Sequence, residues 1–253
     1  MTVVSDSGTA VPTLERAARV VRRGWAVTLV ALLAAAGVYV LALAFTPIEA
    51  RQGLAQKIFY IHVPAAWGAL SAFALVGLAS ALYLWLGDRR LDRFAEASAE
   101  VGVMFAAVML TTGPIWGKPI WGTWWTWDAR LTLTLFLFFL FVGYLALRAA
   151  LQDREERARF SAVVGIMGLL LVPFIHLSVY LFRTLHPQPV VLKPSAPSLP
   201  GDMLRTLLIS VAVFTLLYIG LVMVRYGVGL AEEARESEHE LAARAEELHD
   251  ARA

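Results

Sequence analysis

Two histidines, His62 and His186, are the residues best suited to hold a transition metal or a metal-containing cofactor. His62 precedes Val63-Pro64, and proline is well tolerated in a first helical turn, so we expect His62 at or just before a helix start. His186 precedes Pro187, which biases it away from helix and places it at the exit of an apolar stretch. A pair of neutral imidazoles at one depth suits a six-coordinate haem iron or another transition metal. Either histidine alone is more often a hydrated residue at the membrane interface without a bound ligand.

A tryptophan-rich segment, residues 116–128, reads WGKPIWGTWWTWD and holds five of the chain's eight tryptophans. These five are Trp116, Trp121, Trp124, Trp125 and Trp127. Tryptophan commonly forms an aromatic belt at the membrane interface, but a belt spreads it over all helix ends. Five in one glycine-interrupted run favour a flat surface that stacks on a flat apolar ligand. If the segment is helical, Trp121, Trp124 and Trp125 share one face.

Two charged residues follow the tryptophans. Asp128 stands just before an apolar stretch, where aspartate is a favoured N-cap and its charge suits the positive end of the helix. This capping role does not exclude a role in binding. Arg130 falls in the first turn of the same helix, where the helix dipole disfavours a cation. We therefore expect Arg130 to pair with an anionic group.

Other chemistry is limited by what the sequence lacks. The chain has no cysteine, which excludes disulfides, thiolate-bound zinc, iron–sulfur clusters and thioether attachment of haem. It also lacks a Walker motif, His-Glu-x-x-His and Gly-x-Ser-x-Gly, so we expect no enzyme. His176 lies ten residues before His186, about 15 Å along a helix, and thus near mid-membrane. A functional role and a packed, hydrogen-bonded histidine are equally consistent with that position.

Composition places these residues in a polytopic membrane protein. Apolar and aromatic residues make up 58% of the 253 residues, charged residues make up 17%, and the mean hydropathy is +0.64. A soluble domain carries roughly 25% charged residues. The net charge of +2 gives no support to nucleic-acid binding.

Six apolar stretches predict an all-α fold, a bundle of six transmembrane helices without β-period alternation. They are residues 25–45, 63–86, 101–116, 131–147, 160–182 and 206–224. The third and fourth are shorter than the roughly 20 residues that cross a bilayer. We therefore expect these two to recruit flanking residues or to line protein.

Basic residues predict the orientation of this bundle. Fifteen of the 22 lysines and arginines fall at one set of helix ends, which by the positive-inside rule faces the cytoplasm. The resulting divisions are a cytoplasmic segment 1–24, a transmembrane domain 25–226, an acidic cytoplasmic tail 227–253 and outward loops 46–62, 117–130 and 183–203. Both termini are then cytoplasmic, and both histidines share the outer face with the tryptophans.

The run from Trp121 to Thr132 resembles the "WWD" signature of the haem-handling proteins of cytochrome c biogenesis. With its length and six spans, the chain is similar to the family called cytochrome c maturation protein C or haem exporter protein C. The segment KIFYIHVP at 57–64 resembles the family's first external histidine segment, and TLHPQ at 184–188 resembles its second. The resemblance covers residues 20–226. Larger relatives that attach haem to cytochromes have more spans or a large soluble domain, so delivery is favoured over ligation.

This resemblance implies haem b, held non-covalently at the outer face of the inner (cytoplasmic) membrane. It implies bis-His iron with His62 and His186 as axial ligands and residues 116–128 against the porphyrin. It also implies delivery to a periplasmic haem chaperone, beside the subunits of an ATP-binding cassette transporter and a small single-span helper. The two haem propionates need cations or water. Arg130 and Arg51 are the candidates, and Lys118 is a weaker one.

Two other functions stay open: a permease subunit of a small-molecule transporter, and a scaffold whose tryptophan loop only docks a partner. Because the histidines and tryptophans fall at span ends, we expect a site at the membrane edge rather than a channel. The proline-rich segment 187–200 cannot form a regular hydrogen-bonded ladder. We therefore expect it to be the movable part, which would release His186 before His62.

Overall fold

The computed structural model describes residues 7–250 and confirms the all-α architecture. The helices are α1 (Ser7–Val40), α2 (Phe59–Leu86), α3 (Arg89–Trp121), α4 (Ala129–Ala150), α5 (Arg154–Leu181) and α6 (Gly201–Asp250), with a π-helical turn at Leu41–Phe45 and a 3-10 turn at Leu54–Ile58. Each of the six α-helices contributes to a segment that is long and apolar enough to cross a membrane. No β-sheet forms among the described residues.

Aspartate and glycine residues set several of the helix ends. The side chains of Asp88, Asp128 and Asp153 accept hydrogen bonds from free N–H groups at the starts of α3, α4 and α5, as N-caps do. Gly87 and Gly122 follow the ends of α2 and α3 with φ of 69° and 75°, a left-handed conformation that glycine adopts at little cost. The expected N-cap role of Asp128 is confirmed.

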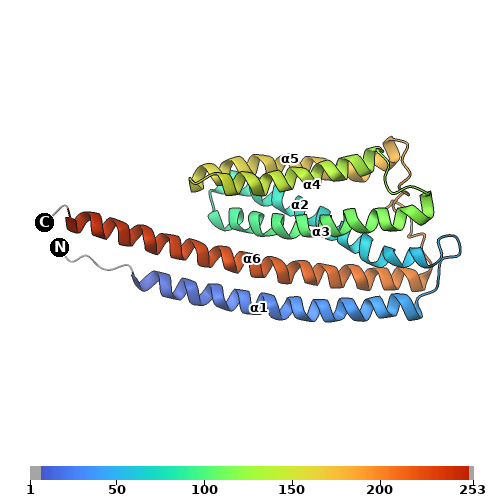
Figure 1. Ribbon diagram of the computed structural model, residues 1–253, viewed down its shortest axis with the longest axis horizontal. Helices are drawn as coiled ribbons and strands as arrows, with labels where there is room; N and C mark the ends of the chain where they lie inside the picture. Colours follow the sequence, from blue (N-terminus) through green and yellow to red (C-terminus); the bar gives the residue numbers. More distant parts are fainter. Residues whose placement is uncertain (1–6, 251–253) are drawn as a thin grey trace.

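The six helices form three packed pairs (Figure 1). Helices α1 and α6 lie side by side along their length, and α6 packs on α2 and α3. Helices α4 and α5 cover the opposite side of the α2–α3 pair. The α1–α6 contact is close because Gly220 has no side chain: a Cβ there would lie 2.7 Å from the backbone nitrogen of Thr28. Such small residues allow close helix packing in membranes.

The main apolar core is built by residues of α2, α3, α4, α5 and α6 and fixes the positions of these helices. Phe73 of α2 stacks on Phe141 of α4 with ring centroids 4.0 Å apart. Buried alanines on α2, among them Ala65, Ala69 and Ala72, let α3 approach closely. This packing continues along the pair up to the end where α2 begins and α3 ends, which is also where His62 lies.

The helix boundaries near His62 and the tryptophans differ from the sequence-based expectation. Helix α2 begins at Phe59, so His62 lies inside its first turn and not before it. Helix α3 runs through Pro114 and Pro119 to Trp121, which shortens the expected loop 117–130 to residues 122–128. Each proline removes one backbone hydrogen bond. Tertiary packing, which supplies most helix stability in proteins, sustains the last turns, because Trp116 contacts both Phe59 and His62.

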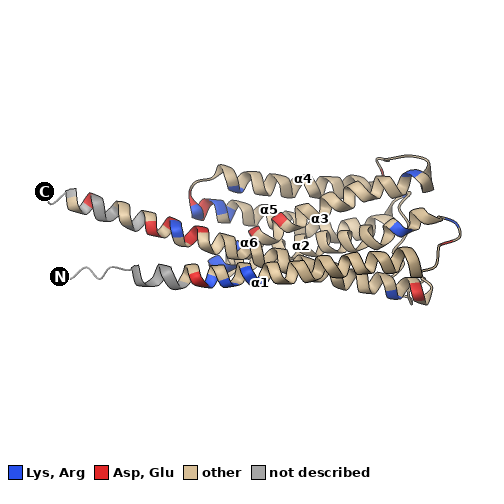
Figure 2. Cartoon of the chain, turned by 60° about the horizontal axis from the view of Figure 1, so that its bottom comes forward, with Lys and Arg blue, Asp and Glu red and all other residues tan. Residues whose placement is uncertain are grey.

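Helix α6 is also longer than expected. It begins at Gly201 and continues without interruption through Asp250, so residues 227–250 of the expected tail continue the helix of the sixth span. Charged residues gather toward the two ends of the bundle, and a broad apolar middle separates them (Figure 2). At the end where α1 begins, Arg148 of α4 binds Asp92 and Glu96 of α3 at 2.6 and 2.9 Å. The membrane orientation and the three-part division stay predictions.

Candidate functional site

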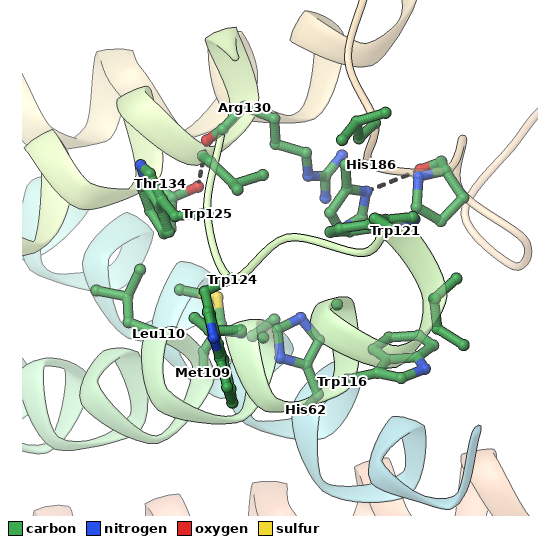
Figure 3. Close-up of a pocket in the computed structure, with 18 of the residues that line it drawn as sticks. His62, Met109, Leu110, Trp116, Trp121, Trp124, Trp125, Arg130, Thr134 and His186 are labelled. Atoms are coloured by element: carbon green, nitrogen blue, oxygen red, sulfur yellow. Dashed lines mark hydrogen bonds between the residues drawn. The ribbon is translucent and has the colours of Figure 1, made fainter. Parts of the chain in front are cut away.

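A partly open cavity lies at the end of the bundle where α3 ends and α4 begins (Figure 3). The predicted residues that line it are His62, Trp116, Trp121, Trp124, Trp125, Arg130 and His186. They come from α2, α3, α4 and two loops, so the site exists only in the folded bundle. The empty space among the lining side chains, its open side included, is ≈ 1040 Å³.

His62 enters the cavity from the first turn of α2 and is held by α3. Its side chain is mostly buried, with the residue 9% exposed. Its Nδ1 lies 3.0 Å from the hydroxyl of Thr112, and the ring of Trp116 meets it edge-on at 5.6 Å. The imidazole is therefore fixed by two side chains of one neighbouring helix.

His186 enters the cavity from the loop between α5 and α6. Its backbone N–H donates to the hydroxyl of Thr184 at 3.1 Å, and its Nδ1 lies 2.9 Å from the carbonyl oxygen of Pro187. A carbonyl only accepts, so Nδ1 carries the proton and Nε2 keeps a free lone pair. Burial and the positive charge of Arg130 lower the pKa of His186 to about 4. The imidazole is therefore neutral at physiological pH.

The tryptophans form two groups around the cavity because α3 ends at Trp121 and is followed by Gly122. Trp116 and Trp121 come from the last turns of α3, and Trp124 and Trp125 come from the loop that follows. Residues 122–128 are not helical, so the single helical face that would join Trp121, Trp124 and Trp125 does not form. Figure 3 shows the four rings on different sides of the cavity.

Asp128 connects the tryptophan loop to the His186 loop. Its carboxylate caps α4 by accepting from the N–H groups of Arg130 and Leu131 and also accepts from the hydroxyl of Thr126 at 2.8 Å. The hydroxyl of Thr184 donates to the same carboxylate. Burial raises the pKa of Asp128, but these hydrogen bonds outweigh burial and hold the pKa below its usual value. The carboxylate therefore stays ionised and joins the two loops.

Two nitrogen donors in the cavity wall have no partner within the described part of the chain. They are Nη1 of Arg130 and Nε1 of Trp125, and both atoms are buried. Buried donors are nearly always hydrogen-bonded in folded proteins. A ligand with acceptor groups would satisfy them.

Five residues that the sequence suggested do not line the cavity, and one of them is Asp128, which acts at the start of α4 as described above. Trp127 points outward and is 76% exposed. Arg51 is exposed, and its backbone N–H bonds to Glu49. The Nζ of Lys118 donates to the carbonyl of Gly122 at 2.8 Å, which helps to end α3. His176 faces Tyr180 along α5, with ring centroids 6.4 Å apart.

The structure also adds residues that the sequence analysis did not identify. Gln52 lines the cavity and accepts a hydrogen bond from Trp116 Nε1 at 3.1 Å. Thr112 holds His62, and Gly113 lies against the same ring. No sequence signal marks these three residues, because their roles depend on how α2 and the preceding turn pack on α3. Thr184 could have been identified from the sequence, because it stands two residues before His186 in the segment 184–188.

The two histidines of the cavity suit a metal ion whose other ligands come from a bound cofactor. Among the described residues, no group of three or more His, Cys, Asp or Glu side chains could hold a bare ion. Two imidazoles fit an iron whose four equatorial positions are filled by a macrocycle. The aromatic walls suit a flat apolar ring, and Arg130 suits its anionic substituents.

Comparisons with known proteins identify the family. The family model described as "Heme exporter protein C" matches residues 7–241. The chain is 39% identical to "Heme exporter protein C" of Haemophilus influenzae over 76% of this chain and 78% of that protein. It is 38% identical to the protein of the same name from Bradyrhizobium diazoefficiens over 78% of this chain and 74% of that one. It is 36% identical to the "Putative cytochrome c biosynthesis ccmC-like mitochondrial protein" of Marchantia polymorpha over 66% of this chain and 71% of that one. With its six membrane-spanning helices, the chain is a multi-pass membrane protein that belongs to the haem exporter protein C family.

Proposed function

We propose that this chain binds haem b non-covalently between His62 and His186 and passes it to a periplasmic haem chaperone for cytochrome c maturation. The observation that carries the proposal is the meeting of these two histidines, 124 positions apart in the sequence, at one aromatic cavity. The names of the relatives, which refer to haem export and to cytochrome c biosynthesis, support the same cargo. Those names describe haem exporters and a biosynthesis protein rather than enzymes, and we propose a delivery role without turnover chemistry.

The aromatic side chains would bind the porphyrin ring. Trp116, Trp121, Trp124 and Trp125 surround the cavity with large flat surfaces, and aromatic pairs contribute about 0.5–1.5 kcal/mol each beyond the burial of apolar area. Trp127 lies outside the cavity lining, so we assign it no contact with the porphyrin. Its ring contacts that of Trp125 with centroids 5.8 Å apart, and this contact helps to hold Trp125 in the cavity wall.

Arg130 would bind a haem propionate. Its guanidinium lines the cavity beside His186 (Figure 3) and has one buried nitrogen without a partner in the described residues. The unpaired indole N–H of Trp125 is a second donor. We do not propose Arg51 for this role, because it is absent from the cavity lining. Asp128 acts indirectly, through the hydrogen bonds that position the two loops.

The location of the cavity supports delivery at the outer face of the inner membrane. The cavity lies at the end of the bundle opposite the one where α1 begins and α6 ends, which we propose faces the cytoplasm. Both termini are then cytoplasmic, as the distribution of arginines predicts. Haem enters and leaves at the membrane edge, beside the subunits of an ATP-binding cassette transporter and a single-span helper.

Absorption spectroscopy of the purified protein tests haem binding. Wild-type protein from haem-replete cells should show a Soret band of low-spin, bis-His haem, and the double variant His62→Ala/His186→Ala should lose it. His176→Ala is the matched control, because this third histidine of the bundle does not line the cavity, and it should keep the wild-type spectrum. A colourless wild-type protein would favour the alternative, a permease subunit of a small-molecule transporter.

Crosslinking tests the delivery step. A periplasmic haem chaperone should crosslink to residues 122–128 and 183–200, and only when haem is present. Crosslinks to residues 87–100 or 148–159 would place the chaperone at the other end of the bundle and would overturn both the orientation and the delivery role.

A further inference from the structure

The hydroxyl of Thr112 has contacts that determine which nitrogen of His62 carries the proton. Its oxygen lies 2.7 Å from the carbonyl oxygen of Val108 and 3.0 Å from Nδ1 of His62. A hydroxyl has one proton, and a carbonyl oxygen can only accept. The Thr112 proton therefore goes to Val108, and the hydroxyl oxygen must accept a proton from Nδ1 of His62.

This hydrogen-bond order leaves the other nitrogen free. A neutral imidazole has one N–H; with Nδ1 protonated, Nε2 has a lone pair and can bind a metal. The Nδ1–Cε1 edge of the ring also rests on the backbone of α3. A Cβ at Gly113 would lie 3.2 Å from Cε1 and 3.7 Å from Nδ1 of His62. With Trp116 edge-on at 5.6 Å, three residues of α3 fix the orientation of this imidazole, and the hydrogen bond to Thr112 fixes its tautomer.

We propose that Thr112 is a positioning residue, which holds His62 in the Nδ1–H tautomer and presents Nε2 to the haem iron. The proposal rests on the haem-binding function proposed above. Hydrogen-bond partners of metal-ligating histidines raise ligand basicity, and their loss typically costs about 10- to 100-fold in metal affinity or activity. Because the hydroxyl of Thr112 is itself polarised by a backbone carbonyl, the hydrogen bonds run in one direction, from His62 to Thr112 to Val108.

The chain offers a matched set of variants for the test. Thr112→Val keeps the shape of the side chain but removes the acceptor, and Thr112→Ser restores it. Thr111→Val is the control, because the hydroxyl of Thr111 donates to Ala107 at 2.8 Å in the same way but on an exposed position of α3. Thr112→Val should release haem to apomyoglobin about 10- to 100-fold faster. It should also raise the haem midpoint potential, since a less basic His62 stabilises ferric iron less. The Thr112→Ser and Thr111→Val variants should behave as wild type.

A haem-free measurement separates this proposal from the proposed function. In protein labelled with ¹⁵N-histidine, the ring shifts of His62, assigned with a His62→Ala variant, should report the Nδ1–H tautomer in wild type. They should shift toward the Nε2–H tautomer in Thr112→Val. This result in a protein that never binds haem would refute the haem-binding function and leave the role of Thr112 in fixing the tautomer intact. An Nε2–H tautomer in wild type, or a Thr112→Val variant with wild-type haem release and potential, would overturn the proposal.

Discussion

The two histidines of the cavity are held by different kinds of structure. His62 lies in a helix, is largely buried, and contacts Thr112, Gly113 and Trp116 of α3. His186 lies in a proline-rich loop without helix or strand, and its imidazole bonds to the carbonyl of the next residue. One imidazole is therefore fixed by tertiary packing between two helices, and the other is held by hydrogen bonds within its own loop.

This difference suggests how a cavity can both retain and release a ligand. A histidine fixed between two helices keeps its position whether or not a ligand is bound. A histidine on a loop can leave with modest local rearrangement, because loops are held by few buried contacts. We infer that His62 is the permanent attachment point and that His186 is the ligand that leaves first.

The largest expected effect comes from removing each histidine separately. His62→Ala should copurify with little haem, whereas His186→Ala should retain five-coordinate, high-spin haem on His62. Added imidazole should restore the low-spin spectrum in His186→Ala, because the neighbouring Leu185 is 48% exposed and that side of the cavity is open. It should not do so in His62→Ala, because the position of the lost ring is buried between α2 and α3. The reverse pattern, measured by absorption spectra with imidazole titration, would contradict the assignment of roles.

Arg130 gives the next largest effect, since it lies beside His186 in the cavity wall. Hydrogen bonds to charged groups contribute about 1.5–3 kcal/mol, so Arg130→Gln should weaken haem affinity about 10- to 100-fold. Arg51→Gln is the control, because Arg51 belongs to an outward loop but does not line the cavity. Haem titration of the two variants in detergent measures the difference. Equal affinities would remove Arg130 from the site.

The tryptophans should show smaller and graded effects. Loss of one aromatic pair at about 0.5–1.5 kcal/mol weakens haem affinity by about 2- to 13-fold, so Trp121→Ala, Trp124→Ala or Trp125→Ala should each fall in this range. Trp127→Ala should have less effect, because Trp127 is absent from the cavity lining. Equal sensitivity at all four positions in the same titration would indicate a general interfacial belt.

The smallest effect concerns the hydrogen bond between the two loops. Thr184→Val removes the link between Asp128 and the backbone N–H of His186 and should speed haem release to apomyoglobin by a few-fold. Thr126→Val is the matched control: its hydroxyl also donates to Asp128, but it does not contact His186. If both variants released haem at the same rate, the link would not act through His186.

Much of this arrangement follows from the sequence, because it depends on local patterns. Apolar periods gave the six spans, Asp128 had the position of an N-cap, and His62 and His186 both preceded prolines at span ends. The family that these residues suggested was confirmed by the family model and by relatives across most of the chain.

The remaining features depend on how the helices pack, which local patterns do not encode. Thr112 matters only because α3 lies against α2 in one register. The extension of α3 through Pro119 depends on packing that outweighs the loss of a hydrogen bond. That extension places Gly122 just after the helix end and leaves Trp127 exposed. The tryptophans therefore do not share one helical face: Trp116 and Trp121 lie on α3, and the others lie in the loop that follows.

Hydrogen–deuterium exchange of wild-type protein in lipid nanodiscs, with and without haem, tests the central comparison most directly. If His62 is fixed and His186 is mobile, haem should strongly slow exchange in residues 183–200. Residues 59–66 should be protected to the same degree in both states. Haem-dependent protection confined to residues 59–66, with unchanged exchange in residues 183–200, would contradict this account.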